Sequence, residues 1–398
     1  MIWPTEKLGN LVTVKGGGTP SKKVEDYWNG SIPWASVKDL KSRQLLKTED
    51  SITALGVEKS ATNIISKGTI IVPTRMALGK VAIAGVDLAI NQDLKAIIVN
   101  DEEVLNKAYL SRFLESKAKY IESEGKGATV KGITLDFLKG LDVPLPPEKE
   151  QKRIAAILDK ADVIRQKRKQ AIQLVDEFLR SVFLDMFGDP VMNPKNWKIS
   201  PLSTLSEKIL NGTTPKGGSD VYVEQGITFL RSQNVWKKCI DLDDVVYIDQ
   251  DTHAKMFKSS LKKKDILITK TGRINTENSS LGRSAIYYGE DGEANINGHV
   301  YLVRLKIDNI HEFIEFILTT KEYRDHIRSV CVGGIDKRQL NKNHIEEFPI
   351  ICPPKGEQQK FVEILNRSQK ALNQYKKQLV EAENLFAALV QRAFSGQL

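Results

Sequence analysis

One stretch of this chain is written twice. Residues 144–162 read PLPPEKEQKRIAAILDKAD, and residues 351–368 read ICPPKGEQQKFVEILNRS. The Pro-Pro, Glu-Gln and Ile-Leu steps of the two stretches align at a constant offset, Pro146 with Pro353 and Gln151 with Gln358. Solenoid repeats recur every 20–50 residues or so, a much shorter period. The sequence therefore predicts one structural unit present twice.

The repeat extends upstream of these stretches. Residues 14–23 (VKGGGTPSKK) match 210–218 (LNGTTPKGG), residues 32–40 match 227–235, and residues 68–85 match a longer segment, 264–289. The second copy is longer, mostly in predicted loops. Core strands that are kept while loops differ indicate one scaffold with two different recognition surfaces.

Composition limits the class of protein. A chain of 398 residues is long enough for two to four domains, and 41% hydrophobic with 27% charged residues is typical of a globular protein. The net charge of +9 permits nucleic-acid binding without demanding it. Three widely spaced cysteines, no apolar run near the length of a membrane span and an N-terminus unlike a signal peptide predict a cytoplasmic protein without a membrane segment.

Each half begins with mixed strand and loop patterns. Short β-branched runs at 70–72, 96–99, 266–268 and 300–305 predict strands. Apolar stripes predict one helix over 103–122 and one over 310–329.

Each half ends with a long window that lacks proline and glycine, up to Gly188 in the first copy and from Gly356 to Gly396 in the second. Each window predicts a helix of about 35–40 residues. Apolar positions alternate by four and three residues, which is typical of a coiled coil and favours pairing of the two helices over separate packing. The predicted seam contains Ile154, Leu158, Ala161, Ile172, Val175, Leu179, Phe361, Leu365, Leu372, Tyr375, Leu379 and Phe386.

Two arginines interrupt the first seam. Arg165 and Arg168 belong to a basic block, RQKRKQ. We favour the interpretation that they extend to solvent at a loose middle of the coil. The alternative is that this face meets phosphate or a partner.

Catalytic motifs are missing from the sequence. There is no Gly-rich phosphate loop with its lysine, no dinucleotide fingerprint, and no zinc-like spacing among five histidines and three cysteines. The sequence predicts no catalytic residue, no metal site and no cofactor bound by this chain.

Basic, polar loops recur at matching places in both halves. They offer charge for phosphates, and Arg, Gln and Asn side chains suited to base edges. The candidate DNA-binding residues of the first half are Lys15, Thr19, Ser21, Lys22, Lys23, Ser36, Lys38, Arg75, Lys80, Lys126 and Lys131. Those of the second half are Thr214, Lys216, Arg231, Gln233, Asn234, Lys270, Arg273, Lys337 and Arg338.

The chain resembles the specificity subunit of type I restriction-modification enzymes over essentially its whole length. The motifs that carry the resemblance are Trp-x4-Leu followed by GGGTPS, the two Pro-Pro-x-x-Glu-Gln helix openings, the junction from FGDP to NPKNW at 187–197, and the C-terminal LVQRAFSGQL. The second copy departs by TTPKGG in place of GGTPSKK, and by a Lys-Gly step that weakens the start of its helix.

The resemblance implies an α+β fold. Two mixed α/β target recognition domains, related by pseudo-twofold symmetry, are separated by an antiparallel coiled coil of two long helices. The expected parts are recognition domain 1 at 1–145, a helical spacer at 146–190, recognition domain 2 at 191–350 and a second spacer at 351–398.

The resemblance also implies a function and partners. The subunit is not catalytic, and it reads a split, asymmetric site in double-stranded DNA. It recruits two N6-adenine methyltransferase subunits that use S-adenosylmethionine, and two restriction subunits that use ATP and Mg²⁺. The seam from 154 to 186 is about 48 Å long at 1.5 Å per residue, or about 14 base pairs, which predicts a nonspecific spacer of about five to eight base pairs.

Two alternatives stay open at this point. The chain is compatible with a recognition module from an enzyme that carries methylase and nuclease on one polypeptide, although no such catalytic block is present. It is also compatible with a coiled-coil scaffold that binds proteins and not DNA, which predicts no salt-dependent DNA binding.

Overall fold

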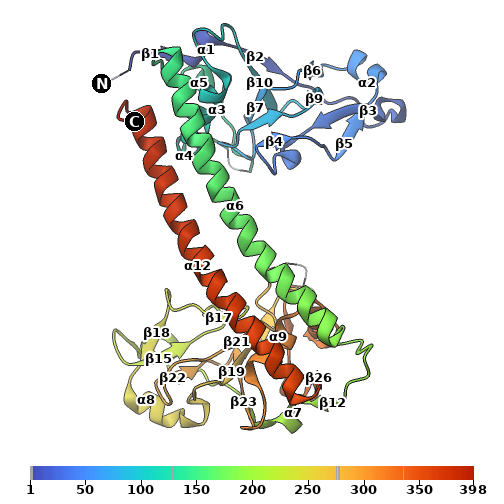
Figure 1. The fold of residues 1–398 in the computed structure, drawn as a ribbon, viewed down its shortest axis with the longest axis vertical. Helices are drawn as coiled ribbons and strands as arrows, with labels where there is room; N and C mark the ends of the chain where they lie inside the picture. The colour runs from blue at the N-terminus through green and yellow to red at the C-terminus, as the bar shows by residue number, and fades with distance from the viewer. Residues whose placement is uncertain (1–2, 128, 275, 277, 335) are drawn as a thin grey trace. The chain divides into compact units, whose positions relative to one another are not determined.

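The computed structural model describes residues 3–127, 129–274, 276, 278–334 and 336–398. They form two compact units (Figure 1). Unit 1 comprises residues 1–170 and 376–398, and unit 2 comprises residues 171–375. This division runs through both long helices, so each unit contains part of each. The predicted boundaries that set the helices apart as separate segments stay a prediction.

Two helices of 40 residues dominate the helical content, α6 (Glu148–Phe187) and α12 (Lys355–Phe394). Their lengths match the prediction, and α12 accommodates Gly356 in its first turn. No helix in the described part of the chain is long and apolar enough to cross a membrane. The shorter helices of unit 1 are α1 (Leu8–Leu11), α2 (Ala54–Glu58), α3 (Lys107–Ser116), α4 (Ala118–Ser123) and α5 (Leu135–Lys139). Those of unit 2 are α7 (Leu202–Leu205), α8 (Gln250–Lys255), α9 (His311–Thr319), α10 (Lys321–Val330) and α11 (Lys342–Glu346).

The strands are short and lie in both units. Those of unit 1 are β1 (Thr5–Lys7), β2 (Val12–Gly16), β3 (Trp28–Ala35), β4 (Gln44–Leu45), β5 (Asp50–Ile52), β6 (Asn63–Ile65), β7 (Ile70–Pro73), β8 (Ala82–Ala84), β9 (Leu88–Ile90), β10 (Leu94–Val99) and β11 (Asp142–Pro144). Those of unit 2 are β12 (Ile199–Pro201), β13 (Ser206–Asn211), β14 (Tyr222–Val223), β15 (Ile227–Leu230), β16 (Val235–Trp236), β17 (Cys239–Ile240), β18 (Val246–Ile248), β19 (Ile266–Thr269), β20 (Thr271–Gly272), β21 (Ser284–Ile286), β22 (Ala294–Ile296), β23 (Val300–Leu305), β24 (Val332–Gly333), β25 (Arg338–Gln339) and β26 (Pro349–Ile351).

The sheets confirm that the repeat is structural. Unit 1 has the strand order β2-β10-β7-β8-β4, and unit 2 repeats its first four strands as β13-β23-β19-β21. The register is also repeated, because Ile70 pairs with Ile83 and Ile97, as Ile266 pairs with Ile286 and Val303. A second sheet in each unit contains a parallel pair, β3 with β9 and β15 with β22. A third pairs the first strand of the unit with the last, β1 with β11 and β12 with β26.

The apolar runs that predicted strands form the centres of these sheets. Every residue of β7 and of β19 is buried. A short continuous apolar run bounded by polar residues is what a strand covered on both faces requires.

The two medium-length helices predicted from sequence are each broken. The segment 103–122 holds α3 and α4, which meet at Lys117, and the segment 310–329 holds α9 and α10. Thr320 ends α9 with an extended backbone, and its Oγ1 accepts a hydrogen bond from the Tyr323 amide at 3.3 Å as the N-cap of α10. The apolar stripe continues across the break, so the hydrophobic pattern alone did not reveal it.

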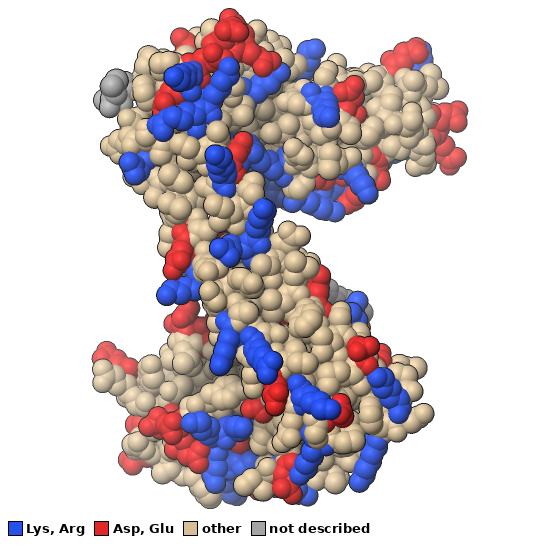
Figure 2. All heavy atoms as spheres, viewed as in Figure 1, with Lys and Arg blue, Asp and Glu red and all other residues tan. Residues whose placement is uncertain are grey.

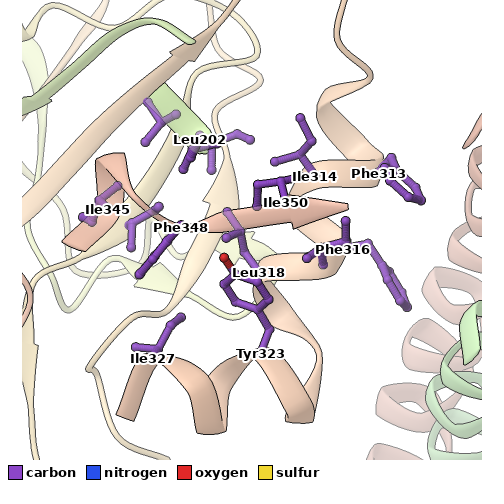
Figure 3. Packing of buried hydrophobic residues seen from close by; sticks show 14 of the residues in the cluster. Leu202, Phe313, Ile314, Phe316, Leu318, Tyr323, Ile327, Ile345, Phe348 and Ile350 are labelled. Carbon is purple, nitrogen blue, oxygen red and sulfur yellow. The ribbon is translucent and has the colours of Figure 1, made fainter. Parts of the chain in front are cut away.

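The core of unit 2 gathers α7, α9, α10, α11 and β26 (Figure 3). Tyr323 is fully buried among them, and its hydroxyl donates to the Pro349 carbonyl at 3.2 Å. The long helices join this core through aromatic rings. Phe183 of α6 and Phe361 of α12 lie 5.1 Å and 4.8 Å, centroid to centroid, from Phe316.

The long helices pair in antiparallel fashion. In unit 2, the C-terminal part of α6 packs against the N-terminal part of α12, with the rings of Phe183 and Phe361 at 5.3 Å. In unit 1, Ile154 and Leu158 near the start of α6 share a core with Ala393 near the end of α12. This confirms the predicted pairing of the two helices.

The predicted seam is the covered side of both helices. Its buried members are Ile154, Leu158, Leu179, Phe361 and Leu372, and its half-buried members are Ala161, Ile172, Val175, Leu365, Tyr375, Leu379 and Phe386. Arg165 also lies on this side. It pairs with Asp162 at 2.6 Å, and its guanidinium carbon is 4.3 Å from the centre of the Phe386 ring. Arg165 therefore has partners within the protein, whereas the sequence analysis favoured a side chain that extends to solvent.

The repeated helix openings share one hydrogen-bond arrangement. The side chain of Gln151 donates to the Pro146 carbonyl at 2.9 Å, and that of Gln358 donates to the Pro353 carbonyl at 2.8 Å, five residues back in both cases. The glutamine thus ties the first turn of each helix to the proline segment before it, whose prolines lack amide donors. The motif therefore forms the same contact in both copies.

The junction after α6 is held by side-chain contacts to backbone. Gly188 ends the helix with φ of +77°, a conformation that favours glycine. Asn193 bonds both backbone groups of Trp197, at 2.8 and 2.9 Å, and the Trp197 indole donates to the Phe187 carbonyl at 3.0 Å. The NPKNW segment therefore closes the end of α6 and leads into β12.

Candidate nucleic-acid interface

The glycine-rich loop after β2 passes very close to the end of β9. A Cβ on Gly17 would lie 1.9 Å from the Ile90 carbonyl oxygen, and the Gly18 amide donates to that same oxygen at 3.0 Å. In unit 2, a Cβ on Gly212 would lie 2.5 Å from the Ile296 carbonyl oxygen. Glycine is needed here for close approach of two backbones. The Gly18 amide is therefore already bonded within the protein.

The side chains beyond these glycines face solvent. Thr19 is exposed, and its hydroxyl bonds the side-chain oxygen of Gln92 at 2.5 Å. The other exposed candidates are Lys15 near the end of β2, and Ser21, Lys22, Lys23, Thr214 and Lys216 in the two loops. These exposed positions are compatible with contacts to the phosphate backbone of a nucleic acid.

Ser36 and Lys38 have partners in unit 1. Ser36 forms a capping box with Asp39, with its hydroxyl at 3.0 Å from the Asp39 carboxylate. Lys38 lies 2.9 Å from Asp50 and 3.2 Å from Glu49, and hydrogen bonds to these two carboxylates raise its pKa. A phosphate at Lys38 would have to compete with two acidic groups.

The loop after β15 holds three further candidates. Gln233 is exposed and bonds the Asp244 carboxylate at 2.5 Å, and Arg231 is 19% exposed and pairs with the same carboxylate at 3.2 Å. Asn234 is buried; its oxygen accepts from the Arg231 amide, and its nitrogen donates to the Asp241 and Asp244 carbonyls at 3.1 and 2.9 Å. Asn234 therefore shapes this loop, and a base-reading role for it would require the loop to open.

Two candidate loops in each unit are joined by the same backbone contacts. In unit 1 the Ile133 amide donates to the Thr74 carbonyl at 2.9 Å, and in unit 2 the Leu340 amide donates to the Lys270 carbonyl at 2.9 Å. In unit 1 the segment after β7 is thereby fixed to the segment after α3 and α4. In unit 2 the segment after β19 is fixed to the segment after α9 and α10 in the same way. The candidates on the joined segments are Arg75, Lys126 and Lys131 in unit 1, and Lys270, Arg273, Lys337 and Arg338 in unit 2. The Lys80 ammonium instead donates to the Leu40 carbonyl. Ala128, Asn275 and Ile335 of the predicted loops lie outside the described residues.

The side chains on this shared frame differ between the units. Arg75 is exposed, with its guanidinium 3.8 Å from Asp93, and its counterpart in the ladder of unit 2 is Thr271. Lys131 corresponds to Arg338, which is half-buried and donates to the Cys331 carbonyl at 3.2 Å. One backbone frame thus presents two different sets of polar groups.

Sequence reasoning missed three arginines beside the unit 2 loops. Arg283 is only 9% exposed, and its guanidinium carbon lies 3.8 Å from the centre of the Trp236 ring. Arg324 and Arg328 of α10 are half-buried. The match of Leu-Gly-Lys at 78–80 with Leu-Gly-Arg at 281–283 was a signal for Arg283, but the two α10 arginines have no sequence signal that separates them from an ordinary surface stripe.

Charge is mixed over the face of the molecule that Figure 2 shows. Figure 2 shows lysine and arginine side chains interspersed with acidic ones on the visible face of both units. Within the described part of the chain, no group of three or more His, Cys, Asp or Glu residues is placed to hold a metal ion.

Comparison with known proteins places this geometry in a family. The model of the type I restriction modification DNA specificity domain matches twice, at residues 2–174 and 194–382. The specificity subunit of the type I restriction enzyme MjaIX from Methanocaldococcus jannaschii is 25% identical over all of this chain and 93% of that protein. The EcoR124I/EcoR124II specificity subunit from Escherichia coli is 38% identical over 41% of each protein.

Solved structures share the fold. The S subunit of a type I restriction-modification system from M. genitalium aligns with a TM-score of 0.57 at 18% identity, over 98% of this chain and 96% of that one. A chain from a study of assembly and conformational transition of the type I R-M system aligns with a TM-score of 0.56 at 15% identity, over 100% of this chain and 98% of that one. Since the family model covers both copies of the repeat, the chain belongs to the family of type I restriction-modification specificity subunits.

Proposed function

We propose that this chain is the non-catalytic subunit that reads DNA for a type I restriction-modification complex. In this proposal each unit reads one half of a split site in double-stranded DNA, and the two half-sites differ in sequence. The chain itself binds no cofactor.

The observation that carries the proposal is the repeated loop frame. The bonds from Ile133 to Thr74 and from Leu340 to Lys270 fix equivalent loops in both units. The side chains on those loops are polar or basic and differ between the units. A common frame with unlike side chains is what two different half-sites require, because side chains that contact base edges determine sequence.

The proposed partners follow from the same role. We infer two N6-adenine methyltransferase subunits that use S-adenosylmethionine, and two restriction subunits that use ATP and Mg²⁺. Methylation of an adenine within a duplex requires the base to leave the stack, so the methyltransferase must distort the DNA near each half-site.

The helix length suggests a spacer. A seam of about 48 Å corresponds to about 14 base pairs between the centres of the recognition domains. For half-sites of a few base pairs, we expect a nonspecific spacer of about five to eight base pairs.

The test is co-expression of this chain with the neighbouring adenine methyltransferase gene in a host that lacks other DNA methylation. Single-molecule sequencing then maps N6-methyladenine across the host genome. We expect one split, asymmetric motif with a fixed spacer. Host cells with the methyltransferase gene alone are the control, and we expect no such motif there.

A purified complex that forms but leaves no methylated motif would count against DNA reading. It would favour a coiled-coil scaffold for proteins. Direct binding to duplex DNA, measured at several salt concentrations, separates the two because a scaffold shows no salt-dependent DNA affinity.

A further inference from the structure

A polar cavity of about 400 Å³ lies beside the paired loops of unit 2. The charged groups that line it are Arg273, Arg283, Lys337 and Asp336, three cations and one carboxylate. Its other lining residues are Thr271, Gly272, Thr276, Asn278, Ser279 and Ser280. Hydroxyl and amide groups together with cations form a lining suited to an oxyanion.

Arg283 is fixed at this cavity on two sides. One face of its guanidinium stacks on Trp236, and its nitrogens donate to the carbonyls of Ser279 at 3.1 Å and Asn278 at 2.5 Å. A guanidinium held this way is pre-organised, so little conformational freedom is lost when it meets a ligand.

Further arginines lie near the loop that contains Ser279. Arg324 also donates to the Ser279 carbonyl, at 3.3 Å, while Arg328 pairs with Asp325 at 2.7 Å. Nη1 of Arg324, Nε of Arg328 and Nε of Arg338 are buried and have no hydrogen-bond partner among the described residues. Buried donors of this kind are normally satisfied in proteins, so an additional acceptor is the expected complement.

The arginines also repel one another. Burial, followed by the charges of Arg328 and Arg283, lowers the pKa of Arg324 to about 10, against which Asp325 acts as the opposing charge. Burial lowers the pKa of Arg283 as well. Clustered like charges destabilise a fold unless an anion joins them, so the arrangement favours a bound anion.

Unit 1 does not repeat this arrangement. Its residue equivalent to Arg283 is Lys80, whose ammonium donates to the Leu40 carbonyl at 2.9 Å. The helix equivalent to α10 is α4, which contains no arginine. The cluster is therefore a property of unit 2.

We propose that this cavity binds a phosphate group of the DNA backbone, with Arg283 as the contacting residue and Arg324 and Arg328 as the positive charge behind it. This inference rests on the proposed function and adds one defined backbone contact to it. Phosphate contacts set the register of a protein on DNA without specifying sequence, so the contact would position the unit 2 loops over their half-site.

The test uses the complex of this chain with its methyltransferase partner and a labelled duplex of random sequence. DNA affinity is measured between 50 and 200 mM salt for the wild type and for Arg283→Gln. We expect the variant to bind about tenfold more weakly at the lowest salt, since a charge-assisted contact is lost. We also expect the slope of log affinity against log salt to become shallower by about one.

The matched control is Lys263→Gln. Lys263 is exposed and precedes β19, whereas the cavity lies beyond the other end of that strand. The control removes one positive charge from unit 2, and we expect the wild-type slope. Arg283→Lys keeps the charge, so we expect it to retain the slope that Arg283→Gln loses.

A second measurement locates the contact. Ethylation of single phosphates on the methylated motif should interfere with wild-type binding at one position that no longer matters for Arg283→Gln. If Arg283→Gln fails to fold, Arg324→Gln replaces it, with the same shallower slope expected. An unchanged slope in a folded variant that binds DNA overturns the inference, whereas wild-type protein that shows no salt-dependent binding overturns the proposed function itself.

Discussion

Gln151 and Gln358 occupy equivalent positions but satisfy different numbers of backbone groups. Gln151 is 1% exposed, accepts from the Asn106 amide at 2.8 Å, and donates to the Val104 and Pro146 carbonyls, both at 2.9 Å. Gln358 is half-buried and donates to the Pro353 carbonyl. The same motif therefore has a larger stabilising role in unit 1.

We expect Gln151→Ala to lower the free energy of unfolding by about 1–3 kcal/mol, because buried groups lose their partners. Gln358→Ala, the matched variant, should cost about 0.5–1.5 kcal/mol. Urea unfolding followed by circular dichroism measures both. Equal effects would show that the extra contacts of Gln151 add nothing.

Glu315 is a buried carboxyl group in α9. Burial raises its pKa to about 7, and the nearby positive charges of Lys238 and Lys237 only partly oppose this shift. Since the folded state holds this proton to higher pH than the unfolded state, with its ordinary pKa of 4.5, the free energy of unfolding falls as pH rises from about 4.5 to about 7.

We expect Glu315→Gln to remove this fall in the free energy of unfolding, which amounts to up to about 3 kcal/mol between pH 4.5 and pH 7. Urea unfolding at pH 5, 6 and 7 measures it, with Glu224→Gln, a substitution of an exposed glutamate, as control. If Glu315→Gln follows the wild-type pH dependence, Glu315 is ionised throughout this range.

Arg283 and Asn234 show what the sequence does not reveal about the environment of single residues. In the sequence both are polar residues in or next to predicted loops. In the structure Arg283 is stacked on Trp236, and Asn234 is buried within its own loop. Burial depends on contacts from distant segments, and local sequence pattern contains no information about these. The exposure of the lysines in the glycine-rich loop was easier to predict, because a lysine next to Gly and Pro is almost always at the surface.

At the scale of elements, α3 and α6 are joined by a network of charges. Arg112 of α3 is 3% exposed and contacts Asp159 at 2.7 Å, Glu115 at 2.7 Å and Asp162 at 3.1 Å. Arg43 contacts two of the same carboxylates, Glu115 at 2.8 Å and Asp159 at 3.0 Å. The network orients α6 on the globular part of unit 1.

We expect Arg112→Met to destabilise unit 1 by about 3 kcal/mol, because partly buried carboxylates lose their partner. Arg153→Met, which removes a half-exposed pair with Glu150 on the same helix, should cost at most about 1 kcal/mol. Thermal unfolding of the two variants provides the comparison. Similar melting temperatures for both would indicate that water replaces the buried contacts of Arg112.

The long helices were predictable because their pattern is long. Forty residues without an internal breaker, and a seam sustained over several heptads, outweigh any single residue such as Gly356. The break at Thr320 was not predictable in the same way, since one threonine in a short apolar stripe fits either a helix interior or a cap. The ladder that joins β20 to β25 was also hidden, because its strands are two residues long and distant in sequence.

At the scale of the whole molecule, the two copies differ where the proposal places DNA. We expect Gln233→Ala in unit 2 to relax sequence preference by about 1–3 kcal/mol at one position of one half-site. The other half-site should be unchanged, because it belongs to unit 1.

The measurement is the methylation motif of the co-expressed complex, read from single-molecule sequencing. Gln225→Ala is the matched control, since Gln225 is an exposed glutamine in the turn between β14 and β15. Relaxation in both half-sites at once would contradict independent reading by the two units.

The recognition loops are tied to the protein by main-chain atoms, as the bonds from Ile133 to Thr74 and from Leu340 to Lys270 show. Most exposed side chains on these loops thus have little part in holding the loops in place. Substitutions there should leave the scaffold intact, so under the proposed function the DNA target of each unit could change without a change of fold.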